Sequence, residues 1–110
     1  MQAPVLLRLA FHDAGTYSAS KGQGGANASV RFELKRPENS GLGRGWKVIE
    51  QTSQELKGSP AEGSVGFADL IALGGAYAVD ATGGPRIGVN LGILHIYSSV
   101  RKYARLDVVA

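Results

Sequence analysis

The sequence predicts an all-α fold contained in one small domain. A chain of 110 residues has room for one hydrophobic core at most. Apolar residues follow helical spacing in three stretches, and no part of the chain reads as a convincing sheet. Segments containing glycine or proline separate the three stretches and mark their ends. We therefore expect helices over residues 3–15, 42–56 and 67–81.

The first helix is expected to carry the chemistry. Pro4 stands where a first-turn proline is tolerated, and Gly15 is able to end the helix. Positions i, i+3 and i+4 share one helix face, so Arg8, Phe11 and His12 should project together. A permanent guanidinium cation and an imidazole that titrates near neutral pH can together move a proton and stabilise a leaving anion. This pairing suits peroxide chemistry.

The connection to the second helix is less regular. Residues 18–29 form a glycine- and serine-rich loop, and the amphipathic piece at 30–35 has no clear assignment. Asn39 or Ser40, in the turn that follows, is the expected N-cap. The second helix then covers about residues 42–56, with two large apolar residues facing inward, Trp46 and Ile49.

The third helix is apolar on nearly every side, which predicts that it is buried. Tyr77, within this helix, is assigned to the core together with Trp46. The Thr-Gly-Gly-Pro sequence at 82–85 ends the helix, and residues 87–91 read as a short extended piece.

Composition excludes several classes of function. The net charge of +3 is mild and scattered, which argues against a nucleic-acid partner. No apolar run reaches the roughly 18 residues that a membrane span needs. The absence of cysteine rules out disulfides and thiolate metal sites. No targeting segment follows Met1, so we expect either a cytoplasmic protein or a chain whose front end is missing.

Three motifs in this order resemble the heme peroxidases of the ascorbate peroxidase and cytochrome c peroxidase class. The likeness is closest to the ascorbate peroxidase-related subgroup. Residues 3–17 resemble the distal helix, with its Arg-x-x-aromatic-His pattern, and Arg-Pro-Glu-Asn-Ser-Gly-Leu at 36–42 resembles the loop carrying the distal asparagine. Residues 67–85 resemble the helix and turn that follow. The resemblance implies that residues 1–110 are the distal-side helical portion of the heme peroxidase fold, an incomplete domain.

The resemblance also implies roles for individual residues. His12 would be the distal base that moves a proton of hydrogen peroxide, and Arg8 would stabilise the developing charge. Asn39 would accept a hydrogen bond from the imidazole, and Phe11 would stack over the heme face. In the full-length context the implied cofactor is heme b, and the implied partners are hydrogen peroxide and a small-molecule electron donor. The implied setting is the response to oxidative stress.

Each assignment has a simpler alternative. A lone histidine on an apolar face is often a core residue, although Arg8 and the two downstream motifs favour a catalytic His12. An asparagine at position 39 is expected both for a helix N-cap and for the distal asparagine of the family, so the residue type does not distinguish the two roles. His95 matches no heme-ligand motif, and the glycines that begin at Gly41 have the wrong spacing for a dinucleotide fingerprint.

The chain departs from the family pattern at several positions. Phe11 stands where ascorbate and cytochrome c peroxidases usually carry tryptophan. The ascorbate peroxidase-related subgroup and the secreted peroxidase classes resemble this chain in having phenylalanine there. Asp13 resembles the aspartate after the distal histidine that binds calcium in the secreted classes, and Gly25, Asn27 and Ser29 stand where further calcium ligands would fall. Asn27 replaces an expected carboxylate, which leaves Asp13 and Ser29 as weak calcium candidates. No metal site is therefore assigned.

The proximal histidine that holds the iron belongs to a part of the domain with no counterpart here. We expect a fragment or truncated form whose stability and activity alone are doubtful. The alternative is an inert truncated product or a partner-binding pseudo-peroxidase. Residues 93–104 interrupt the family pattern and read as an insertion, or else as a real surface loop. The compartment stays open between the chloroplast, by resemblance, and the cytoplasm.

Overall fold

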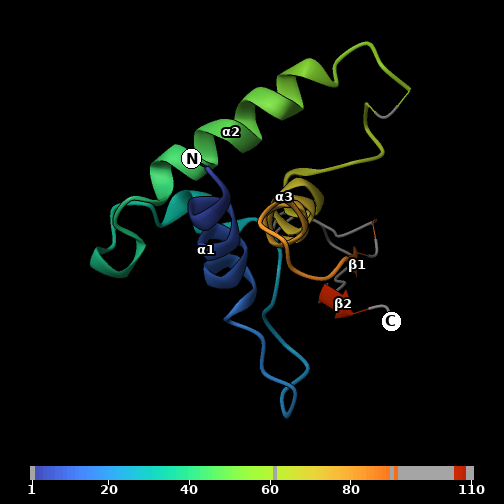
Figure 1. Cartoon of the computed structure of the whole chain (residues 1–110). Helices are drawn as coiled ribbons and strands as arrows, with labels where there is room; N and C mark the ends of the chain where they lie inside the picture. The colour runs from blue at the N-terminus through green and yellow to red at the C-terminus, as the bar shows by residue number, and fades with distance from the viewer. Residues whose placement is uncertain (1, 61, 90, 92–105, 109–110) are drawn as a thin grey trace.

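Three α-helices form the body of the computed structural model, which describes residues 2–60, 62–89, 91 and 106–108 (Figure 1). The helices are α1 (Ala3–Ala14), α2 (Leu42–Glu55) and α3 (Phe67–Ala81). Two short 3-10 turns, η1 (Ser29–Phe32) and η2 (Pro37–Asn39), lie between α1 and α2. The predicted helical class is confirmed, and the three predicted helices are each found within one residue of their expected bounds.

The turn η1 (Ser29–Phe32) overlaps the first half of the segment 30–35, which had no assignment from the sequence. The N-cap prediction for α2 is wrong. Neither Asn39 nor Ser40 caps the helix; the N-cap is Gly41, whose φ of 84° lies in the left-handed region. Glycine adopts this conformation without steric cost, so the chain can turn sharply from η2 into α2. The turn leaves the Asn39 side chain free to point inward.

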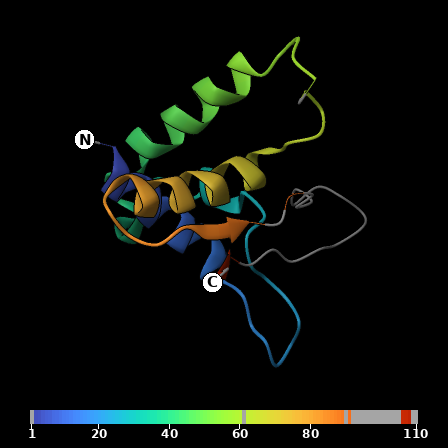
Figure 2. The same cartoon turned by 45° about the vertical axis from the view of Figure 1, so that its right-hand side comes forward.

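The core lies where α1 meets α2 and α3 (Figure 2). Leu9 of α1, Leu42 of α2 and Ile71 of α3 are almost completely buried there. Gly75 allows α1 and α3 to approach each other closely, since a Cβ at this position would lie 2.6 Å from the Cβ of Ala10. That distance is too short for two carbon atoms, so α1 can contact α3 at this depth only because position 75 has no side chain.

The prediction that α3 is buried on nearly every side is wrong for one of its faces. Tyr77 was expected in the core, yet it is 67% exposed, and Leu73 is also exposed on this helix. Apolar residues predict burial only where another element covers them, and α1 and α2 cover the opposite face of α3. Trp46 is partly buried against the core and meets the Phe67 ring edge-on, with centroids 5.1 Å apart.

The extended piece expected after α3 is present as strand β1 (Ile87–Val89), which pairs antiparallel with β2 (Leu106–Val108). This two-stranded pairing was not predicted, because three-residue strands leave little periodicity in a sequence. Residues 93–104 and His95 lie outside the described residues, so the insertion remains a prediction. Within the described residues, no helix combines the length and the apolar character needed to cross a membrane.

Candidate active site

Arg8, Phe11 and His12 lie on one face of α1, at successive turns. The rings of Phe11 and His12 have centroids 5.9 Å apart and are tilted by 59°. Arg8 and His12 both make hydrogen bonds to the η2 turn. Arg8 donates to backbone carbonyls of the turn, and His12 bonds to the side chain of Asn39. The structure therefore brings together Arg8, His12 and Asn39, although as many as 31 positions separate them in the sequence.

The hydrogen bonds of Asn39 determine which nitrogen of His12 carries the proton. The Asn39 Nδ2 group donates to the backbone carbonyl of Glu33 at 2.7 Å, which orients the amide. Its Oδ1 atom therefore faces Nδ1 of His12, at 2.6 Å. Since an amide oxygen can only accept, the Nδ1 atom must be the donor. In the neutral ring the lone pair then resides on Nε2, which becomes the basic nitrogen.

Arg8 is held against the same turn by its guanidinium group. Its two terminal nitrogens donate to the carbonyl oxygens of Glu38, at 2.7 Å, and of Ser40, at 2.5 Å. These two carbonyls flank Asn39 in the chain. The turn itself lies at the surface, whereas the Asn39 side chain is only 3% exposed. A permanent positive charge is thus fixed within one helical turn of the imidazole.

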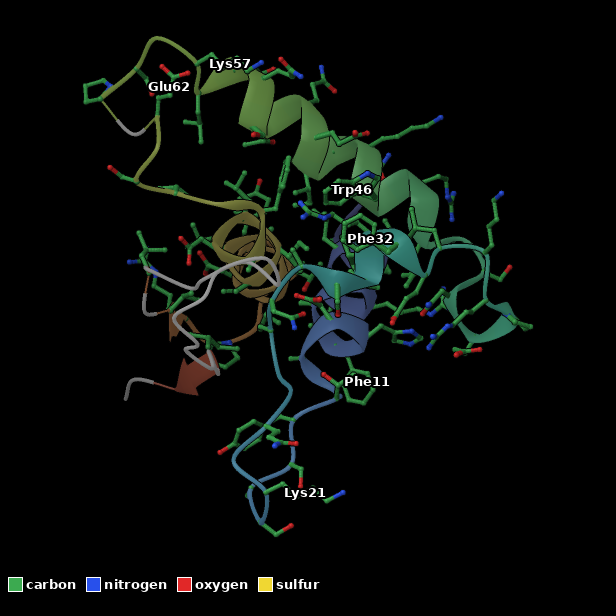
Figure 3. The ribbon with its side chains drawn as sticks, turned by 180° about the vertical axis from the view of Figure 1, so that it is seen from behind. Phe11, Lys21, Phe32, Trp46, Lys57 and Glu62 are labelled. Atoms are coloured by element: carbon green, nitrogen blue, oxygen red, sulfur yellow. The ribbon has the colours of Figure 1, made fainter. Side chains whose placement is uncertain are left out.

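Phe11 is the most exposed large apolar side chain of α1. Its side chain is 72% exposed, and Leu7, one helical turn earlier, is 43% exposed. Figure 3 shows the Phe11 ring on the side of α1 that faces away from α3. A ring this exposed contributes little to the core. The face of α1 therefore combines an uncovered apolar surface with an imidazole and a fixed cation.

The profile of a family described as Peroxidase matches residues 1–103. The chain belongs to the peroxidase family. The predicted resemblance to the ascorbate peroxidase class, over its N-terminal part, is confirmed by the relatives that follow.

Curated relatives of this peroxidase-family chain include the peroxisomal L-ascorbate peroxidase 5 of Arabidopsis thaliana, which is 48% identical over 87 residues. That match covers 77% of this chain and 29% of the relative. The chloroplastic thylakoid lumenal 29 kDa protein of the same organism is 44% identical over 81 residues, covering 72% of this chain and 23% of the relative. The chain thus spans less than a third of either protein.

A solved structure shows the same likeness in three dimensions. The crystal structure of the TL29 protein from Arabidopsis thaliana superposes with a TM-score of 0.67 at 42% sequence identity. The superposition covers 74% of this chain and 33% of the TL29 chain. The fold described above is therefore part of a peroxidase fold.

Asp13, one of the two weak calcium candidates in this peroxidase-family chain, binds backbone groups. Its side chain is 1% exposed, and its two oxygens accept hydrogen bonds from the N–H groups of Ala28 (3.0 Å) and Val30 (3.2 Å). Burial raises the pKa of the Asp13 carboxyl, and these hydrogen bonds oppose that shift. The backbone N–H of Ser29, the other candidate, donates to the Asn27 side chain at 3.0 Å. Across the described ranges, no three His, Cys, Asp or Glu side chains gather as a metal site would require.

Sequence reasoning missed three groups that hold the site together. The backbone carbonyl of Glu33 orients Asn39, and the carbonyls of Glu38 and Ser40 hold Arg8. No residue type signals these contacts, because every residue carries the same carbonyl group.

Proposed function

We propose that this chain provides the distal half of a heme peroxidase site, which reduces hydrogen peroxide to water while a small-molecule donor is oxidised. The observation that carries the proposal is the arrangement of His12, Asn39 and Glu33, which leaves the lone pair of Nε2 on the α1 face that also presents Arg8. Family membership supports the same reaction class.

The residues present fit one face of a flat, largely apolar cofactor such as heme b. Phe11 and Leu7 offer uncovered apolar surface, and burying such surface against a ring is favourable by about 25 cal/mol per Å². Phe11 would contact the face of the macrocycle, from the same face of α1 that carries Arg8 and His12. When bound, the heme would supply the redox chemistry. The proximal ligand is expected from the part of the domain that this chain does not span.

His12 acts as the acid and base in this proposal. Its Nε2 atom accepts a proton from hydrogen peroxide and returns it to the oxygen that leaves as water. In the neutral ring, the hydrogen bond from Nδ1–H to Asn39 fixes the tautomer in which Nε2 carries the lone pair, and the same bond stabilises the imidazolium that forms during the reaction. General acid–base catalysis of this kind contributes about 10²–10⁴-fold to a rate.

Arg8 provides the positive charge. As the O–O bond of peroxide breaks, negative charge develops on the departing oxygen, and a fixed cation stabilises it. Because two backbone carbonyls already hold the guanidinium, little reorganisation is needed at the moment of reaction. The identity of the electron donor does not follow from the residues of this chain.

Reconstitution with hemin tests the proposal. The chain is titrated with hemin, a Soret band is recorded, and the oxidation of a dye is followed with and without hydrogen peroxide. We expect peroxide-dependent oxidation that falls about 10²–10⁴-fold in His12→Leu. The matched control is His95→Leu, which removes the second of the two histidines and should leave the rate unchanged.

Equal rates in His12→Leu and the parent chain would refute the assignment of His12. The absence of both the Soret band and the oxidation would instead support the alternative function, an inert or partner-binding form. The same two substitutions in a chain of the relatives' full length would then decide whether the site is active when the domain is complete.

A further inference from the structure

The η2 turn has to be held in place relative to α1 for Asn39 to reach His12. Two hydrogen bonds within the turn, from Asn39 N–H to Arg36 and from Ser40 N–H to Pro37, fix its shape. The bond from Asn39 to Glu33 orients the amide relative to the segment just before the turn. None of these three bonds joins the turn to α1.

Arg8 supplies such a link. Its guanidinium donates to Glu38 and Ser40, the carbonyls on either side of Asn39, and Arg8 precedes His12 by one helical turn on the same face. Hydrogen bonds from a charged donor are roughly twice as strong as neutral ones, and the planar guanidinium fixes both acceptors in one geometry. The Nη1 atom of Arg8 would also lie 3.7 Å from a Cβ at Gly41, so the turn closes around the side chain.

We propose that Arg8 is a positioning residue as well as a catalytic one: it clamps the two carbonyls that flank Asn39 and thereby sets the tautomer of His12. This inference rests on the proposed function for its catalytic meaning, although the clamp itself is a property of the chain without heme. Loss of the clamp lets the surface-exposed turn move away from α1. The Asn39 oxygen then no longer selects Nδ1–H, and the fraction of rings with a basic Nε2 decreases.

The tautomer can be measured directly by ¹⁵N NMR of imidazole-labelled chain, under alkaline conditions that keep the ring neutral. A His95→Gln background leaves His12 as the single histidine. In this background we compare the parent chain with Arg8→Lys and Asn39→Ala. Lysine keeps the charge but lacks the planar fork that matches two carbonyls. The matched control is Arg44→Lys, at an exposed position of α2.

We expect Arg8→Lys to lower the ratio of Nδ1–H to Nε2–H tautomers by about 2- to 10-fold, the equivalent of one hydrogen bond. Asn39→Ala should lower it at least as much, and adding Arg8→Lys to Asn39→Ala should lower it no further, because both act through one contact. Arg44→Lys should leave the ratio unchanged. Far-UV circular dichroism verifies helix content, and Arg8→Gln replaces Arg8→Lys if the latter loses its helices.

An unchanged ratio in the folded Arg8 variant, with a lowered ratio in Asn39→Ala, would overturn the clamp. An unchanged ratio in both variants would overturn it as well, since Asn39 would then not select the tautomer. Dye oxidation by the hemin-loaded chain is a separate readout. The expected tautomer changes, together with no effect of His12→Leu on dye oxidation by a chain of the relatives' full length, would support the clamp and refute the proposed function.

Discussion

The side-chain oxygen of Asn39 lies 2.6 Å from Nδ1 of His12, although 27 positions separate the two residues in the chain. The same amide donates to Glu33 at 2.7 Å, so both of its polar atoms are engaged while the side chain is buried. A buried amide with two hydrogen bonds also contributes to stability.

Asn39→Ala should therefore destabilise the chain. The substitution removes the partner of the Glu33 carbonyl and of the His12 Nδ1–H group, and we expect a loss of about 1–3 kcal/mol in the free energy of unfolding. Urea denaturation measures it. Gln51→Ala, at an exposed position of α2, is the control and should change stability by less than about 0.5 kcal/mol. Equal midpoints for the two variants would contradict the prediction.

Asp13→Ala tests whether the Asp13 carboxylate stabilises the fold by holding the loop that contains Ala28 and Val30. The change leaves the N–H groups of Ala28 and Val30 without their acceptor in a buried position, at a cost of about 1–3 kcal/mol for each group. Asp80→Ala is the comparison, because Asp80 forms an exposed ion pair with Arg86 that contributes about 0–1 kcal/mol. If both variants unfold at the same urea concentration, Asp13 does not organise the loop.

The pH dependence of stability follows from the pKa of Asp13. Burial raises this pKa above 3.8, the ordinary value. At pH values between the ordinary and the raised pKa, the native state therefore binds more protons than the unfolded state. The contribution of the group is fully present below the ordinary value and is lost as the pH rises through the raised one. The free energy of unfolding of the parent chain, relative to Asp13→Asn, should therefore fall as the pH increases from about 4.

Urea midpoints of the two proteins at a series of pH values provide this comparison. A hydrogen bond lost in Asp13→Asn changes the difference in unfolding free energy between the two proteins by the same amount at every pH. Only the slope of that difference against pH therefore reports the titration of Asp13. A difference that stays flat, or that rises with pH, would show that the hydrogen bonds outweigh burial at this carboxyl.

Gly75→Ala should separate α1 from α3. The added Cβ would lie 2.6 Å from the Cβ of Ala10, so the helices must shift and the overpacked contact costs about 1–3 kcal/mol. Gly74→Ala is a closely matched control, because its Cβ would meet Ile49 at an ordinary 3.4 Å and alanine favours a helix by about 1 kcal/mol. Thermal unfolding should place Gly75→Ala below the parent and Gly74→Ala at or above it. The reverse order would mean that α1 does not pack at this depth.

Phe11→Ala should affect hemin binding far more than folding. A side chain that is 72% exposed stabilises the fold by less than about 0.5 kcal/mol. Against a macrocycle the same ring would bury surface worth about 1.5 kcal/mol or more, so we expect hemin affinity to fall about tenfold. Tyr77→Ala removes a similarly exposed ring from α3 and should leave the affinity unchanged. Fluorescence titration with hemin measures both, and equal affinities would remove Phe11 from the proposed heme face.

Local sequence patterns were sufficient to predict the helices of this chain. Pro4 and Gly15 delimit α1, and the third helix has the predicted bounds, because helical period and chain-breaking residues act over a few neighbouring positions. The N-cap of α2 was predicted wrongly, because a polar side chain in the preceding turn can either cap the helix or bond elsewhere. Asn39 bonds to His12 and does not cap α2. The exposure of Tyr77 escaped it as well, because burial depends on which elements cover a face.

The sequence by itself determined the shared face of Arg8, Phe11 and His12, which follows from helix geometry and needs no other part of the chain. Only the tertiary structure decided that the η2 turn meets this face, that Asn39 orients the imidazole, and that two backbone carbonyls hold the guanidinium. Helix periodicity depends on neighbouring residues, whereas the contact of His12 with Asn39, 27 positions apart, depends on how the helices pack. The carbonyl acceptors of Arg8 could not be predicted either, because every residue carries a backbone carbonyl and no residue type marks the ones that are used.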